Sequence, residues 1–174
     1  MDHDFNKLNK EFFFNLAGTF EDDNYSWITE RVAIGSHISP YLPFQIIVNM
    51  NYPYNGATHN SIQRKKYTFD YRNYIIYTVG LNDDKKFSII PILTQLLSLL
   101  RDECETRKNL RILFHCFAGK SRSVAAALAY LVEIDKMKYI DALQLVKDKR
   151  PIVAMNIGFQ KELESFYIDK VVEV

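Results

Sequence analysis

The sequence ILFHCFAGKSRS, from Ile112 to Ser123, joins an apolar strand to a short loop that contains a cysteine and an arginine. An alanine-rich segment, 124–131, follows and favours a helix. A loop between a strand end and a helix start has free backbone N–H groups beside the positive end of the helix dipole, so it is predicted to bind an anion. The same environment favours the thiolate form of Cys116. Arg122 adds a planar guanidinium that can hold two phosphate oxygens. This combination favours nucleophilic attack on phosphorus.

Composition limits the function classes. A chain of 174 residues fits one domain with a sizeable core. The net charge of +1 argues against a general nucleic-acid or anionic-membrane binder, and no segment is apolar and long enough to span a bilayer. The first residues are acidic and do not resemble a secretory signal. Two cysteines make no disulfide framework, and a thiolate needs a reducing compartment, so we expect a cytoplasmic protein, with the nucleus as the alternative.

Hydrophobic periodicity predicts one α/β unit. Strands are expected at 27–34, 45–50, 65–70, 74–81 and 111–115, and helices at 4–16, 89–101, 123–135, 139–149 and 158–171. Alternation of this kind implies a central mixed sheet flanked by helices.

The spacing of His115, Cys116, Gly119, Arg122 and Ser123 matches the signature His-Cys-x-x-Gly-x-x-Arg-Ser/Thr. This motif resembles that of the cysteine-dependent protein tyrosine phosphatases, and its local form is similar to the dual-specificity branch. The resemblance extends over roughly residues 25–168, through the segments 28–36, 44–50, 141–151 and 156–163. It implies a phosphatase-like α/β fold, with 25–174 as the catalytic domain and 1–24 as an N-terminal helical extension.

The resemblance also implies roles for the residues of the loop. Cys116 is the expected nucleophile, and Ser123 is expected to donate a hydrogen bond to its sulfur. Ser123 can also be read as the N-cap of the following helix, and the two roles are compatible. The expected phosphate-binding residues are Phe117, Ala118, Gly119, Lys120, Ser121 and Arg122. His115 is expected to make a buried hydrogen bond that shapes the loop, and Asn156 to brace it. No cofactor and no metal are expected, since His3, His37, His59 and His115 are scattered.

The general acid is expected on a loop upstream of the cysteine. The family has an Asp after an apolar-x-apolar pattern, which here begins at Val79 and reaches Asp83. Asp84 follows directly. Neighbouring residues of an extended segment point to opposite sides, so only one of the two can face the loop easily, and the register favours Asp83.

The expected activity is hydrolysis of phosphotyrosine and of phosphoserine or phosphothreonine in protein substrates through a phosphocysteine intermediate. The alternatives are a phosphoinositide phosphatase, an RNA 5′-phosphatase of the same superfamily, and a pseudophosphatase that binds phosphoproteins without turnover. Lys120 matches one of the two loop lysines of lipid-directed relatives, but Phe117 stands where the other would be. The residues around Arg122 do not match the RNA-directed branch, so no nucleic acid is expected as a partner.

Two further features have open readings. One face of the expected N-terminal helix carries Phe5, Leu8, Phe12 and Leu16. This helix either packs on its own domain or forms a surface for a partner or for a homodimer. Cys104 is expected to be a buried structural thiol, with an oxidative disulfide to Cys116 as the alternative.

Overall fold

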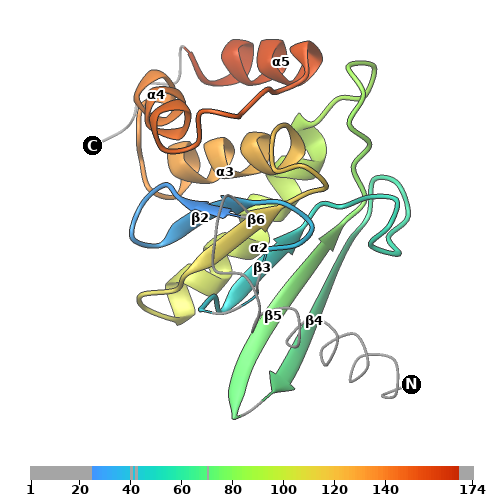
Figure 1. Ribbon diagram of the computed structural model, residues 1–174, viewed down its shortest axis with the longest axis vertical. Helices are drawn as coiled ribbons and strands as arrows, with labels where there is room; N and C mark the ends of the chain where they lie inside the picture. Colours follow the sequence, from blue (N-terminus) through green and yellow to red (C-terminus); the bar gives the residue numbers. More distant parts are fainter. Residues whose placement is uncertain (1–24, 40, 42, 70, 169–174) are drawn as a thin grey trace.

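Three short apolar strands form the centre of the molecule. They are β2 (Val32–Gly35), β3 (Ile46–Asn49) and β6 (Ile112–His115). β6 pairs in parallel with β2 on one side and with β3 on the other. Strands buried on both faces read as continuous apolar runs, which is the pattern of a parallel sheet. The computed structural model describes residues 25–39, 41, 43–69 and 71–168 of the chain (Figure 1).

Three further strands complete a six-stranded sheet in the order β1-β2-β6-β3-β5-β4. β5 (Arg72–Val79) is parallel to β3. The two edge strands are antiparallel to their neighbours: β1 (Tyr25–Trp27) to β2, and β4 (Ile62–Phe69) to β5. The predicted central mixed sheet flanked by helices is therefore confirmed.

Four helices lie on one face of this sheet (Figure 1). They are α2 (Ile90–Thr106), α3 (Arg122–Glu133), α4 (Tyr139–Lys149) and α5 (Ile157–Tyr167). α3 separates α4 and α5 from the strands. α3 is buried from Arg122 to Val132. Its small alanine side chains let it approach the sheet closely, which fixes the position of its N-terminus relative to the end of β6.

The opposite face of the sheet carries a smaller cluster. Because side chains alternate along a strand, Ala33, Ile47 and Leu113 point away from the helices. They pack with Phe44, whose ring lies 5.1 Å from that of Trp27. The sheet therefore has an apolar layer on each side.

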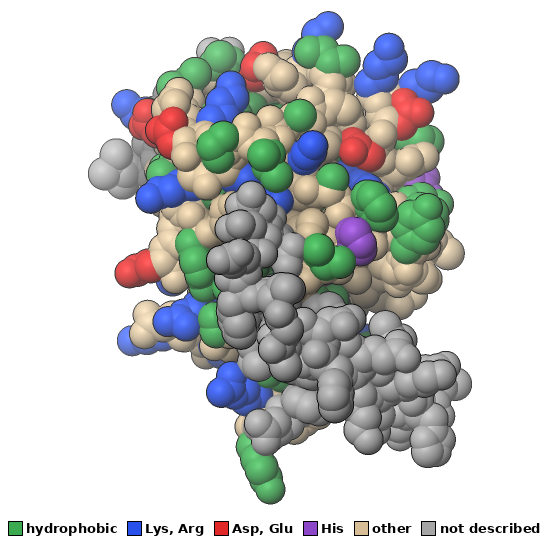
Figure 2. Space-filling view, in the orientation of Figure 1, with side chains coloured by type: hydrophobic (Ala, Val, Ile, Leu, Met, Phe, Trp, Pro, Cys, Tyr) green, Lys and Arg blue, Asp and Glu red, His purple; other side chains and the backbone are tan. Residues whose placement is uncertain are grey.

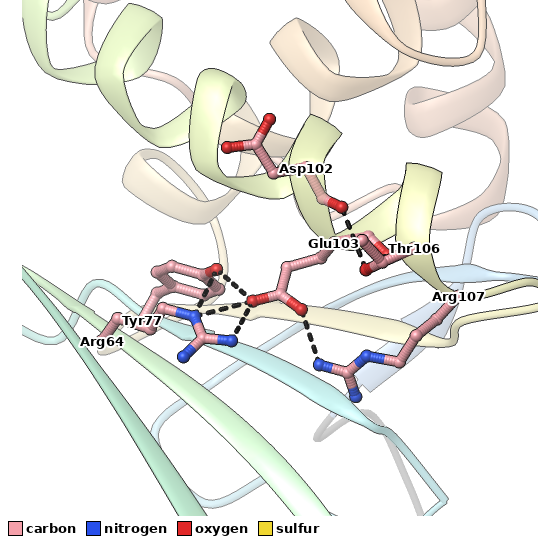
Figure 3. A network of polar contacts seen from close by, with 6 residues as sticks. All are labelled: Arg64, Tyr77, Asp102, Glu103, Thr106 and Arg107. Carbon is pink, nitrogen blue, oxygen red and sulfur yellow. Dashed lines mark hydrogen bonds and ion pairs between the residues drawn. The ribbon is translucent and has the colours of Figure 1, made fainter.

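The β4–β5 hairpin extends beyond the rest of the sheet and is tied to α2 by a polar network (Figures 1 and 3). The buried carboxylate of Glu103 accepts hydrogen bonds from Arg64 Nε at 2.7 Å, Tyr77 Oη at 2.8 Å and an Arg107 guanidinium nitrogen at 2.5 Å. Burial by itself raises the pKa of Glu103, but these hydrogen bonds hold it below its ordinary value. The network therefore keeps a buried charge fully compensated.

The structure corrects some predicted boundaries. The single strand expected at 27–34 is wrong: the Thr29 hydroxyl accepts hydrogen bonds from the backbone N–H groups of Arg31 and Val32, at 3.2 and 3.1 Å, and closes a turn. Two strands, β1 and β2, result. β4 begins at Ile62 rather than at residue 65, and β5 begins at Arg72, directly after Tyr71, which turns the chain with a φ of +60°.

Some predictions lie outside the described residues. These are the helix at 4–16 and the homodimer through it. In the part of the chain that is described, no helix combines the length and apolar character needed to cross a membrane. Charged side chains of both signs are interspersed over the face shown in Figure 2.

Candidate active site

Four loops meet at the carboxyl edge of the parallel strands. They follow β2, β3, β5 and β6, and they contribute the segments 36–38, 51–56, 80–84 and 116–121. In open α/β sheets ligands bind in the crevice outside this edge. The residues predicted from the sequence to act together are therefore drawn from loops that share one end of the sheet.

Cys116 lies directly after β6 and is 2% exposed. Its Sγ is 3.2 Å from the hydroxyl oxygen of Ser123, which is buried in the first turn of α3. The N-cap reading of Ser123 is wrong, because Ser121 occupies the N-cap position. The Ser123 hydroxyl is therefore placed to donate a hydrogen bond to a thiolate.

The loop is held open by hydrogen bonds from other segments. Three of its carbonyls accept from residues outside the loop: Phe117 from His37 N at 3.0 Å, Gly119 from Arg150 Nε at 2.8 Å, and Lys120 from Ala154 N at 2.9 Å. In a planar trans peptide the next N–H points opposite to the carbonyl. The N–H groups of Ala118, Lys120 and Ser121 are thereby directed away from these anchors, toward the inside of the loop.

Gly119 is required by the close approach of two neighbours. Its φ is +64°, a conformation that side chains disfavour. A Cβ atom there would lie 2.5 Å from the Gly35 carbonyl oxygen and 2.6 Å from the Arg150 guanidinium. Only glycine lets the loop backbone pass between β2 and Arg150.

Arg122 is 7% exposed, and its guanidinium is fixed by the backbone. A terminal nitrogen donates to the carbonyl oxygen of Tyr52 at 2.6 Å. Its buried Nε–H has no hydrogen-bond partner among the described residues. A buried, oriented donor of this kind suits a phosphate oxygen.

The structure brings Asp83 to the loop. Its carboxylate Oδ1 accepts hydrogen bonds from the Ser121 hydroxyl and from Asn156 Nδ2, both at 2.7 Å. The Asp84 carboxylate instead accepts from the backbone N–H of Lys86 at 2.9 Å and closes a local turn. This geometry supports the predicted register, with Asp83 beside the loop.

Asn156 links three parts of the site. Its backbone N–H donates to the Ser121 hydroxyl at 3.0 Å, its side-chain nitrogen donates to Asp83, and its side-chain oxygen caps α5 by accepting from Phe159 N at 2.9 Å. Asn156 therefore lies where it can brace both the loop and the Asp83 carboxylate.

His115 is buried at the end of β6. Burial, followed by the nearby His37, lowers the pKa of His115 to about 3, so its ring is neutral at physiological pH. Its Nε2 lies 3.3 Å from the hydroxyl of Tyr41. His115 thus contacts Tyr41 through its ring nitrogen and adds no positive charge beside Cys116.

The remaining predicted residues are at the surface or elsewhere. Phe117, Ala118 and Lys120 are exposed.

Cys104 is only partly buried; it lines a hollow of about 220 Å³ together with Leu110, and its Sγ is 3.3 Å from the Tyr130 hydroxyl. Leu110 precedes β6 and Cys116 follows it. Since a four-residue strand spans roughly 13 Å, a disulfide between the two cysteines would need a large rearrangement.

Several residues that shape the site escaped the sequence reasoning. Arg150 lies in the segment 141–151 that carries the resemblance; it is 2% exposed and donates to the Gly119 carbonyl of the loop. The sequence signal for Arg150 is its position directly before Pro151, at the end of a predicted helix. Tyr52 acts through a backbone carbonyl, and the sequence carries no signal for that. Within the described ranges, no group of three or more metal-ligating side chains converges.

Comparisons with known proteins agree with this geometry. The family described as "Dual specificity phosphatase, catalytic domain" matches residues 33–169. The 123R protein of Invertebrate iridescent virus 6, whose name describes a tyrosine phosphatase, is 33% identical over 134 aligned positions, and the alignment covers 71% of this chain and 91% of that protein. Dual specificity protein phosphatase 1 of Arabidopsis thaliana is 28% identical over 155 aligned positions, and the alignment covers 86% of this chain and 72% of that protein.

A solved structure shows the same fold. Human DUSP28 aligns with a TM-score of 0.60 at 20% identity, over 84% of this chain and 95% of that one. The chain belongs to the dual specificity phosphatase catalytic-domain family. It is accordingly a phosphoric monoester hydrolase of the protein-tyrosine/dual-specificity class, and the resemblance inferred from the loop motif is confirmed.

Proposed function

We propose that this protein removes phosphate from tyrosine and from serine or threonine in protein substrates, through a phosphocysteine intermediate. One observation carries the proposal: Cys116, Arg122 and Asp83 converge on a single loop. Ser123 contacts the Cys116 sulfur, the Tyr52 carbonyl fixes Arg122, and Ser121 ties Asp83 to the loop.

In the first step the Cys116 thiolate attacks phosphorus and an S–P bond forms. The P–O bond of the ester breaks, and Asp83 gives its proton to the leaving oxygen. Arg122 and the inward N–H groups of the loop stabilise the equatorial phosphate oxygens, where charge is concentrated in the transition state.

In the second step a water molecule attacks phosphorus while Asp83, now a carboxylate, accepts a proton from it. The S–P bond breaks, inorganic phosphate leaves, and the sulfur departs as a thiolate. Because Ser123 Oγ is 3.2 Å from Sγ, its hydroxyl can stabilise that leaving thiolate.

The chemistry uses side chains and water alone. We therefore expect activity to survive chelation and to be lost on alkylation of the thiol. A cytoplasmic or nuclear location suits the reduced cysteine that the mechanism needs.

The test is turnover of a small aryl phosphate and of phosphotyrosyl and phosphothreonyl peptides. Cys116→Ser is expected to lose turnover by about four or more orders of magnitude, while still binding vanadate. Cys104→Ser is the matched control, since it removes the other cysteine and leaves the loop intact; its turnover should stay near that of the unaltered protein.

Two results would contradict the proposal. One is appreciable turnover by pure Cys116→Ser protein. The other is loss of activity on chelation with recovery on adding a divalent ion, which would replace the cysteine mechanism by a metal-dependent one.

A further inference from the structure

His37 contacts Phe117, the residue that follows the nucleophile Cys116, through both its ring and its backbone. The rings of His37 and Phe117 are stacked, with centroids 4.5 Å apart and planes at 3°. The His37 Nδ1 lies 2.8 Å from the Phe117 carbonyl oxygen. A carbonyl only accepts, so Nδ1 carries the hydrogen. The backbone N–H of His37 donates to the same carbonyl at 3.0 Å. The Phe117 ring is therefore held in place although it is 51% exposed.

Tyr54 lies beside Phe117. Its ring centroid is 6.2 Å from that of Phe117, within the range of favourable aromatic pairs, and it is 78% exposed. Its neighbour Asn55 fixes this loop, because the Asn55 side-chain nitrogen donates to the carbonyls of Asn49 and Val79 at 3.1 and 3.0 Å.

Both rings are tied to the phosphate-binding residues through short stretches of backbone. Phe117 is one residue from Cys116. Tyr54 is two residues from Tyr52, whose carbonyl holds Arg122. Three aromatic rings from the loops after β2, β3 and β6 thus form one exposed surface, the aromatic platform (His37, Tyr54, Phe117), at the carboxyl edge of the sheet.

Neither the phosphate chemistry nor the core accounts for this surface. Phosphate is bound by N–H groups and Arg122, whereas a contiguous group of exposed rings is typical of a binding surface. When the phosphate lies over Cys116, the ester group extends outward from the loop. A tyrosine ester places an aromatic ring directly at that point, whereas a serine or threonine ester places only one carbon before the peptide backbone.

We infer that the aromatic platform binds the ring of a phosphotyrosyl residue and makes this site selective for phosphotyrosine over phosphothreonine. The inference rests on the proposed function, because it concerns substrates of the same loop. His37 acts as a positioning residue that orients Phe117, and Tyr54 and Phe117 make the contact with the substrate ring.

The test compares two peptides that differ only in phosphotyrosine against phosphothreonine. The unaltered protein should have the higher kcat/KM on the phosphotyrosyl peptide. In Tyr54→Ala this value should fall about 3- to 10-fold, mainly through KM, as expected for one aromatic contact. The phosphothreonyl value should change less than about 2-fold. Tyr54→Phe keeps the ring and should restore the preference.

Two further variants sharpen the test. Tyr71→Ala removes another exposed tyrosine, at the distant turn of the β4–β5 hairpin, and should leave both values unchanged. His37→Phe keeps the stack on Phe117 without the Nδ1 donor, and should retain more of the phosphotyrosine preference than His37→Ala.

The inference falls if Tyr54→Ala lowers both values equally, or neither, while the unaltered protein hydrolyses both peptides. That result leaves the proposed function standing. If the unaltered protein hydrolyses neither peptide, or Cys116→Ser remains active, then the proposed function is wrong. The inferred role of the aromatic platform in phosphotyrosine selectivity is then wrong as well.

Discussion

Two carboxylates of this molecule sit in hydrogen-bond networks of opposite character. Glu103 is buried and accepts from two arginines and a tyrosine, so its charge is matched on every side (Figure 3). Asp83 is exposed and accepts from a hydroxyl and an amide, both neutral. A carboxylate paired with arginines holds elements together, whereas an exposed carboxylate oriented by neutral donors is accessible to a substrate at the loop.

The comparison assigns the Glu103 network to the stability of the fold and the Asp83 network to the proposed reaction. Glu103 joins α2 to the β4–β5 hairpin, whose turn at Tyr71 lies at the opposite end of the sheet from the loops at the carboxyl edge. Asp83 joins the loop after β5 to Ser121 and Asn156. Substitutions in the two networks should therefore affect different measurements.

Among the substitutions that test this comparison, the largest effect is expected for Asp83→Asn. A poor leaving group builds more negative charge on oxygen, so loss of the acid should slow hydrolysis of phosphoserine by about 10²- to 10⁴-fold and that of an activated aryl phosphate far less. Asp84→Asn is the matched control and should show no such dependence. If Asp84→Asn has the steep leaving-group dependence instead, then Asp84 and not Asp83 is the general acid.

Arg122→Lys is expected to come next, with turnover lowered about 10²- to 10³-fold and phosphate bound more weakly. Lysine keeps the charge but not the planar fork, nor the fixed bond to the Tyr52 carbonyl. Arg107→Lys makes the same chemical change in the Glu103 network and should leave kcat/KM within about 2-fold. Near-normal turnover by Arg122→Lys would mean that charge alone suffices.

Asn156→Ser should have a moderate effect. Serine also serves as an N-cap, so α5 keeps its start, but the donor to Asp83 is lost. We expect turnover of phosphoserine to fall about 5-fold, with less change for an activated aryl phosphate. A fall of equal size for both substrates, together with a lower Tm, would indicate that Asn156 acts only through the fold.

The smallest effect on activity is expected for Glu103→Gln, with kcat/KM of the folded protein within about 2-fold of normal. Its free energy of unfolding should fall by about 2 kcal/mol at pH 7. This loss is smaller than for a fully buried ion pair, because the arginines around Glu103 are partly exposed to solvent. A denaturation midpoint and a rate, measured on the same sample, check this. Loss of activity without loss of stability would erase the distinction between the two networks.

The same variant has a pH signature. Although burial alone raises it, the pKa of Glu103 lies below its ordinary value because of its hydrogen bonds. The ionised carboxylate therefore stabilises the fold fully above the unfolded value of about 4.3, and this contribution is lost as pH falls through the lowered value. The stability difference between the unaltered protein and Glu103→Gln should shrink in acid, which denaturation at pH 7 and below pH 4 would reveal.

The sequence was most informative where structure is local. β6, the loop and α3 are contiguous, so the pattern from Ile112 to Ser123 was enough to predict all three, and the alternation before Asp83 was enough to favour it over Asp84. The break in 27–34 was missed because it depends on one hydroxyl, that of Thr29, capturing two backbone N–H groups. Single side-chain turns of that kind leave no periodic signal.

Contacts across the chain could not be predicted. Arg150 donates to a carbonyl 31 positions away, and Arg122 to one 70 positions away. A backbone carbonyl has no residue identity, so a sequence cannot name it as a partner. The stacking of His37 on Phe117 and the pairing of Glu103 with Arg64 likewise required the assembled fold.

The carbonyl anchors of the loop have a consequence for how activity is acquired. They come from the segment after β2, the end of α4 and the residue Ala154, so the loop takes its shape only when both halves of the chain have docked. Contacts between segments far apart in sequence form late, after local helices. During refolding, the far-ultraviolet circular dichroism signal should therefore recover before turnover does. The time course of recovered turnover then reports the last step of folding.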